Sequence, residues 1–122
     1  MSLSKSEEQV MSYLWKLKRA FIKDLMAEFP EPRPAKTTVL TLLKRMNDKG
    51  FVDYRVFGNS REYFPLVQKK TYFTGHFNNL IKDFFNDSPA QFASFFTKEA
   101  ELTQEQLEEL RSIIDQKIEG KK

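Results

Sequence analysis

The chain has 122 residues, of which 40% are apolar and 30% charged, with a net charge of +3, as in an ordinary soluble domain. It contains no Cys, which excludes disulfides, thiolate metal sites and a cysteine nucleophile, and no segment approaches the roughly 18 uninterrupted apolar residues of a membrane span. The first ten residues, "MSLSKSEEQV", carry acids and lack an apolar signal region, so we expect a cytoplasmic protein.

Two amphipathic helices are predicted before residue 30. Ser4 followed by Glu7 has the spacing of a capping box. The apolar residues after it recur on one helix face up to about residue 17: Val10, Met11, Leu14 and Trp15. A shorter apolar stripe follows, and Pro30 ends it: Phe21, Ile22, Leu25, Met26 and Phe29.

A third helix is predicted after a proline-stiffened connector. Pro32 and Pro34 force the residues before them out of the helical region, and Pro34 suits the first turn of the next helix. Gly50 stands where a helix C-terminal glycine is expected. The predicted buried stripe is Val39, Leu42, Leu43 and Met46, with Leu40 at its margin. The opposite, exposed face is Thr37, Thr38, Thr41, Lys44, Arg45 and Asp48.

A β-hairpin is predicted after this helix. "FVDYRVF" and "REYFPLV" are rich in aromatic and β-branched residues, and "GNS" separates them. Pro65 cannot donate a backbone hydrogen bond, so we expect its strand at a sheet edge. Helix, helix, connector, helix and hairpin together predict a winged helix-turn-helix over residues 3–67.

The second part of the chain is predicted to be helical and to form a dimer. We place the boundary between residues 1–70 and 71–122, with a long helix, a short apolar segment after Ser88, and a last helix capped by Thr103. Only 52 residues carry these wide apolar faces, so a second copy is expected to cover them. Packing back on the first domain is the alternative. The predicted interface residues are Phe73, Phe77, Leu80, Ile81, Phe84, Phe85, Leu107, Leu110 and Ile114.

The charge distribution and the third helix indicate DNA binding by the first domain. Residues 1–70 contain 14 Lys and Arg against 8 Asp and Glu, whereas residues 71–122 contain 6 against 9. A basic half indicates a polyanionic partner, and Thr, Lys and Arg can contact base edges and phosphates of a duplex. A solvated helix face, or a winged helix that docks only on protein, is the alternative. The predicted DNA-binding residues are Lys36, Thr37, Thr38, Thr41, Lys44, Arg45, Arg55, Asn59 and Arg61.

An enzyme is not expected. The single His, His76, lies between apolar positions of a predicted helix, and no Ser or Asp stands at a spacing typical of a nucleophile pair. The sequence also offers neither a Gly-rich loop nor a set of metal ligands. We therefore predict no catalytic residues, no metal site and no cofactor.

Four segments together resemble the penicillinase-repressor (BlaI/MecI-type) family of bacterial winged-helix transcriptional regulators. They are "LSKSEEQVMSYLW", "KTTVLTLLKRMNDKGFV", "YFPLV" and "ELTQEQLEELRSII", and they span nearly the whole chain in the same order. The resemblance implies a homodimeric repressor with an N-terminal winged helix and a C-terminal three-helix dimerisation domain. Each third helix would occupy a major groove of a palindromic operator. Thr38, Thr41 and Arg45 match the family's recognition-helix pattern.

The resemblance also implies a route for relieving repression. In the family, a membrane-embedded sensor protease signals, and the repressor is cut in its dimerisation domain at an Asn-Phe bond. The matching pair in this chain is Phe95–Phe96, so the Phe after the bond is kept and the Asn before it is replaced. Copper-responsive relatives carry a C-terminal cysteine motif, which this chain lacks.

Overall fold

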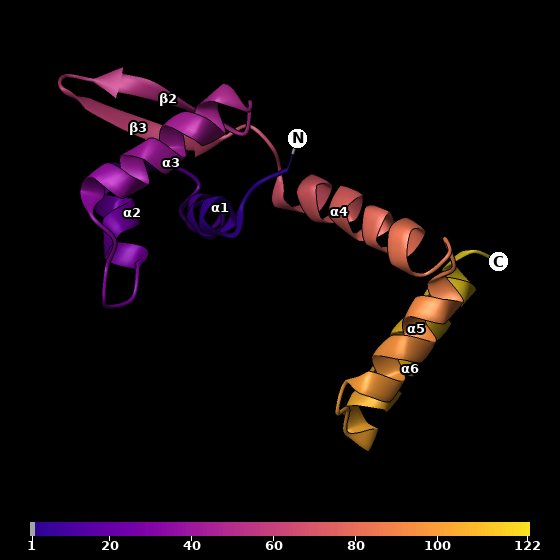
Figure 1. The fold of residues 1–122 in the computed structure, drawn as a ribbon. Helices are drawn as coiled ribbons and strands as arrows, with labels where there is room; N and C mark the ends of the chain where they lie inside the picture. Colours follow the sequence, from indigo (N-terminus) through magenta and orange to yellow (C-terminus); the bar gives the residue numbers. More distant parts are fainter. Residues whose placement is uncertain (1) are drawn as a thin grey trace. The chain divides into compact units, whose positions relative to one another are not determined.

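The computed structural model describes residues 2–122, which form two compact units, Met1–Thr74 and Gly75–Lys122 (Figure 1). The elements in chain order are α1 (Lys5–Leu17), β1 (Ala20–Phe21), α2 (Ile22–Glu28), α3 (Lys36–Asp48), β2 (Val52–Phe57), β3 (Ser60–Pro65), α4 (Lys69–Phe84), α5 (Pro89–Glu99) and α6 (Gln104–Gly120). The predicted fold class, mainly α with a small hairpin and a winged helix followed by a helical C-terminal part, is confirmed.

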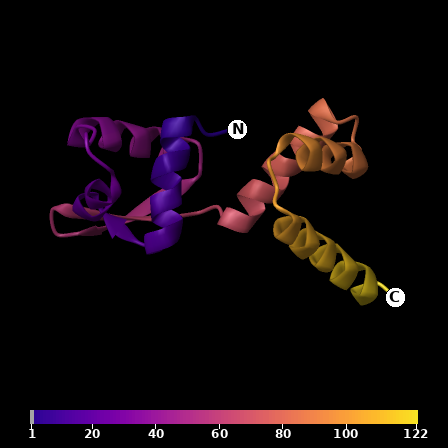
Figure 2. The same cartoon turned by 90° about the horizontal axis from the view of Figure 1, so that it is seen from below.

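The first unit is built around one apolar core. The Ser4 hydroxyl accepts a hydrogen bond from the Glu7 backbone N–H, and the Glu7 carboxylate accepts one from the Ser4 N–H, so the predicted capping box starts α1. In Figure 2, α1, α2 and α3 surround a common centre, with the hairpin along one side. The side chains that fill this centre with less than 2% exposure include Val10, Met11, Leu14, Leu25, Val39, Leu43, Met46 and Val52.

The sheet has three strands, one more than the sequence predicted. β1, only two residues long, pairs with Glu62 and Tyr63, so the order is β1-β3-β2 and β3 is central. The expectation that Pro65 confines its strand to an edge was therefore wrong. Pro65 is compatible with a central strand because it is the last residue of β3, beyond the part that β1 covers.

The hairpin turn and the end of α3 use glycine where the backbone requires a positive φ. β2 and β3 are joined by Gly58 and Asn59, and Gly58 has φ +60°, as in the two-residue turns that favour hairpins. Gly50 has φ +82° directly after Lys49, the C-terminal cap of α3. At the other end, Ala35 is the N-cap of α3, so Pro34 lies before the cap and not in the first turn.

The second unit contains the end of α4 together with α5 and α6. The Ser88 hydroxyl caps α5, and Thr103 with Gln106 forms the predicted capping box of α6. Phe92 lies at the centre of a group of rings, with centroids 5.1 Å from Phe77, 5.4 Å from Phe85 and 5.9 Å from Phe96. Among the described residues of this unit, only Ile81 is buried.

The division between the units falls inside α4, after Thr74, whereas the sequence placed it after residue 70. The first turns of α4 belong with the first unit because Tyr72 packs against the apolar core. Its hydroxyl also donates a hydrogen bond of 2.6 Å to the Glu8 carboxylate of α1. Across residues 2–122, none of the helices combines the length and the apolar character that crossing a membrane requires.

Candidate nucleic-acid interface

α3 presents one buried and one exposed face. Val39, Leu43 and Met46 are fully buried against the core, because apolar residues recur every three to four positions. The six residues predicted for the outer face are all exposed: Thr37, Thr38, Thr41, Lys44, Arg45 and Asp48. The core therefore fixes α3 and leaves a row of hydroxyl, methyl and cationic groups facing outwards.

The hydroxyl groups of this row differ in what they have to offer a ligand. Thr41 donates its hydroxyl proton to the Thr37 carbonyl at 2.9 Å, so only its methyl group and oxygen lone pairs remain available. Thr38 has no side-chain hydrogen bond within residues 2–122 and lies in the first turn of the helix. Its hydroxyl can therefore both donate to and accept from a base edge.

The cations of α3 are only weakly engaged. Lys44 lies 3.5 Å from the Asp48 carboxylate one turn later, and both side chains are largely exposed. Such a pair contributes little in water, so its ammonium group can turn to a phosphate at small cost. Ala35 provides no side-chain cap to the first turn of α3, where Lys36 is the first residue. The N–H groups of this turn favour an anion.

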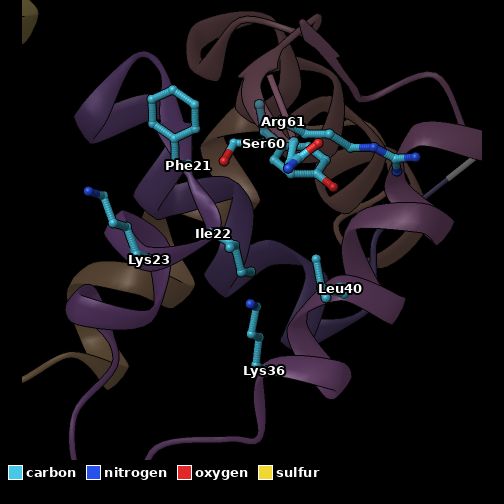
Figure 3. A pocket seen from close by; sticks show the side chains of 9 residues that line it. Phe21, Ile22, Lys23, Lys36, Leu40, Ser60 and Arg61 are labelled. Carbon is cyan, nitrogen blue, oxygen red and sulfur yellow. The ribbon is translucent and has the colours of Figure 1, made fainter. Parts of the chain in front are cut away.

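A depression of about 540 Å³ lies beside the start of α3. Lys36 and Leu40 line it from α3, and Phe21 and Ser60 lie on the opposite side (Figure 3). Lys23, from α2, is a further cation of this depression that the sequence analysis did not single out. Its exposed position on a short amphipathic helix was the only available signal.

A second depression, of about 500 Å³, continues this surface along α3. It shares Leu40, Arg61 and Tyr63 with the first one and extends to Lys44. The Arg61 guanidinium lies over the Tyr54 ring, 4.3 Å from its centroid, which holds the cation beside the helix. The polar row of α3 is therefore bordered by basic side chains from α2 and from the hairpin.

The two arginines predicted on the wing lie on opposite faces of it. β2 and β3 pair with Arg55 opposite Glu62 and Val56 opposite Arg61. Neighbouring positions of a strand point to opposite faces, so Arg61 shares its face with Tyr54 and Tyr63 while Arg55 lies on the other. The hairpin thus brings Arg61 and Asn59 to the α3 surface, and Arg55 lines a separate depression. The separation of Arg55 from Arg61 could have been predicted from the sequence, because strand alternation and the two-residue turn fix which face each side chain is on.

A buried ion pair fixes the end of α3, and the sequence analysis missed it. Glu7 is only 1% exposed, and its Oε1 accepts a 2.7 Å hydrogen bond from Lys49 Nζ, which also donates to the Ser2 carbonyl. Burial raises the pKa of the Glu7 carboxyl, but the hydrogen bonds from Lys49 and Ser4 lower it, and the resulting pKa lies below its ordinary value. Glu7 Oε2 has no hydrogen-bond partner among the described residues.

This pair joins the first turn of α1 to the cap of α3, 42 positions apart in sequence. It therefore helps to fix the position and tilt of α3 relative to α1. Burial of the Tyr72 hydroxyl and its bond to Glu8 raise the Tyr72 pKa to about 12, so this hydroxyl stays protonated and keeps donating to α1.

The predicted interface residues of the second part are mostly exposed. Phe84 is 75% exposed, and Leu110 is partly buried. Five others are between 38% and 57% exposed: Phe73, Phe77, Leu80, Leu107 and Ile114. Ile81 is already buried within its own chain, and Phe85 is partly buried among the rings of α5. The Phe95–Phe96 bond lies inside α5, and both side chains are exposed.

The residues brought together on α3 and the wing are hydroxyls and cations, the groups that contact phosphates and base edges. Within residues 2–122, no group of three or more His, Cys, Asp or Glu is placed to hold a metal ion. The arrangement is that of a binding surface.

Comparison with known proteins agrees with this description. The model of the family described as "Penicillinase repressor" matches residues 3–116. The methicillin resistance regulatory protein MecI of Mammaliicoccus sciuri is 27% identical over 116 residues, 94% of either chain. The proteins of the same description from Staphylococcus aureus (strain N315) and Staphylococcus epidermidis are 26% identical over the same share. The chain therefore belongs to the penicillinase-repressor family, whose members are DNA-binding transcriptional regulators and not enzymes.

Proposed function

We propose that this protein is a transcriptional repressor that binds a palindromic operator as a homodimer, with each α3 in a major groove. The observation that carries the proposal is the exposed polar face of α3, bordered by Lys23, Lys36 and Arg61. A helix of this kind reads bases with its outer side chains, while neighbouring cations hold the phosphates on either side of the groove.

The roles of the side chains follow from their chemistry. Thr38, with its uncommitted hydroxyl and its methyl group, reads a base edge, and Thr41 offers its methyl to a thymine. Lys36 and Lys44 neutralise phosphates, assisted by the N–H groups at the start of α3. Arg45 takes a phosphate or a guanine. Arg61 and Asn59 contact the backbone beside the helix or the adjacent minor groove.

The homodimer is proposed because the second unit leaves its apolar residues uncovered. Phe84, Ile113 and Ile114 are each more than half exposed, on α4 and α6. Removing such side chains from water contributes about 25 cal/mol for each Å² of apolar surface, so a second copy presenting the same surface is favoured. The two α3 helices of the dimer then share one operator, which raises the affinity through their linkage.

Relief of repression is proposed to follow cleavage of the Phe95–Phe96 bond by a membrane sensor protease system. The bond lies in a helix, and the Phe96 carbonyl accepts a hydrogen bond from the Ala100 N–H. α5 must therefore open locally before a protease can hold the chain in an extended form. The many exposed apolar side chains of the second unit favour such opening.

The experiment is a fluorescence-anisotropy titration of the full chain with duplexes from upstream of its own gene, at several salt concentrations. We expect affinity to fall steeply with salt, by about 0.9 in log K per log salt for each phosphate neutralised. Lys44→Ala reduces this slope by about one contact, whereas Lys98→Ala, an exposed lysine of α5, leaves it unchanged. A protein that binds no duplex even at low salt has a winged helix used for protein docking alone.

A further inference from the structure

A polar depression that the proposed function does not use lies on the face of the hairpin that carries Arg55. Its volume of about 430 Å³ is within the range of small-molecule sites. Lys18 and Arg19 line it from the link between α1 and β1, and Arg55 lines it from β2. Trp15 and Phe64 contribute aromatic walls. Two segments of the first unit thus bring three cations to one concave surface.

The charges in this depression are unbalanced. Its one carboxylate, Glu62, lies opposite Arg55 across the two strands, against three cations. No ion pair joins Lys18, Arg19 or Arg55 to a carboxylate anywhere in the described part of the chain. The Arg55 guanidinium instead lies over Phe64, 5.9 Å from the ring centroid, which orients its N–H groups without neutralising it. The depression therefore attracts an anion.

The backbone conformation of Lys18 supports a binding role for its ammonium group. Lys18 caps α1 with φ 72° and ψ −40°, a region that residues with a Cβ atom rarely adopt. Glycine occupies such a position without strain and is the common residue at a helix end with positive φ. The chain thus carries an ammonium group at a place where glycine would be the more stable choice.

We propose that Lys18, Arg19 and Arg55 form a binding site for a small phosphorylated anion, separate from the surface around α3. Arginine forks donate two parallel hydrogen bonds to a phosphate, and a nearby lysine adds charge, so this set suits a ligand with two or more negative charges. A duplex held on α3 lies on the Arg61 face, whereas this site lies on the Arg55 face. A free small phosphate is therefore the occupant, and not the DNA backbone.

Trp15 is the only tryptophan of the chain and lines the site, so its fluorescence reports on occupancy directly. The full-length protein is titrated with inorganic pyrophosphate at constant ionic strength, and separately with a short duplex of random sequence. We expect a saturable change in Trp15 fluorescence with pyrophosphate. Arg55→Gln and Arg19→Gln each raise the apparent Kd about tenfold or more, since each removes a charge-assisted hydrogen bond. Lys16→Gln, a lysine of α1 outside the depression, leaves the Kd unchanged.

Lys18→Gly keeps the test decisive if the arginine variants fold poorly. This variant removes the ammonium group and relieves the positive φ, so we expect weaker pyrophosphate binding together with an unchanged or higher Tm. Absence of a saturable signal, or a signal that all of these variants retain, overturns the proposal. A signal obtained only with the duplex, and lost in Arg55→Gln, also overturns it and assigns the depression to the DNA surface. Because the readout is pyrophosphate binding, it is independent of operator recognition.

Discussion

The two units of this chain treat their apolar residues in opposite ways. The first unit buries a continuous set of side chains from α1, α2, α3 and the sheet, and Val10, Leu14 and Leu43 are 0% exposed. In the described residues of the second unit, Ile81 alone is buried, although this unit contains six of the twelve Phe residues. The first unit also exposes a few large apolar side chains, such as Phe57 and Leu66, but these lie outside a complete buried core, which the second unit lacks.

The difference is the physical basis of our proposal that the second unit packs against a second copy, whereas the first unit has a core of its own. A small helical segment has too much surface for its volume to enclose wide apolar faces. The first unit avoids this because the hairpin and α1 cover the inner side of α3. The function that we propose follows the same division, since a surface that reads DNA needs a rigid support and a dimerisation surface needs exposure.

The largest expected effect comes from a charge in the apolar surface of the second unit. Phe84→Asp places a carboxylate where we propose that a second copy packs, and the desolvation cost should yield monomers. Loss of the linkage between the two α3 helices then weakens operator binding roughly 100-fold or more. Sedimentation measures the first effect and anisotropy the second. Leu66→Asp, at an exposed apolar residue of the first unit, is the matched control and should remain dimeric.

Equivalent truncations in the two units separate intrinsic stability from association. Leu43→Ala creates a cavity in the core of the first unit and should cost about 3 kcal/mol of unfolding free energy at any protein concentration. Leu80→Ala, at a residue 38% exposed in the single chain, should destabilise in a way that depends on protein concentration. Urea denaturation at several protein concentrations measures the effect of each variant. If the destabilisation by Leu80→Ala does not depend on protein concentration, Leu80 does not contribute to association.

Acid should act on the first unit through Glu7. Its pKa lies below the ordinary value of 4.5 in the folded protein, so its contribution to stability is complete above about pH 4.5 and is lost as the pH falls further. Lys49→Met leaves the Glu7 charge buried and unpaired and should cost roughly 2–3 kcal/mol at neutral pH. Urea unfolding between pH 7 and pH 3 should show that the unfolding free energy of this variant falls less with acid than that of the unmodified protein. Lys16→Met, which removes an exposed pair, should cost less than about 1 kcal/mol.

The smallest effect concerns base reading by α3. Thr38→Ala removes a hydroxyl that has no hydrogen bond within residues 2–122 and should reduce the preference for operator over random duplex by about 1 kcal/mol. Thr97→Ala, in α5 of the second unit, removes a hydroxyl bonded to the Ala93 carbonyl and should leave that preference intact. Anisotropy with both duplexes distinguishes the two. An equal loss on operator and random DNA assigns Thr38 to the phosphate backbone.

Local chemistry in the sequence was sufficient to predict most elements. The capping boxes at Ser4 and Thr103 involve residues three positions apart, so their geometry hardly depends on the rest of the fold. The same holds for the buried stripe of α3 and for Gly50 after it, because helix period and backbone sterics are properties of short segments. The exposed polar face of α3 follows from that stripe.

The tertiary structure decided what depends on partners far apart in the chain. β1 exists only because Ala20 and Phe21 meet β3, and the buried Glu7 is paired with Lys49, which reaches it from the end of α3. Strand register separated Arg55 from Arg61, and the placement of α2 brought Lys23 to the surface beside the start of α3. A sequence specifies which side chains are apolar or charged over a few residues, but the pairing of distant segments results from packing the whole core at once.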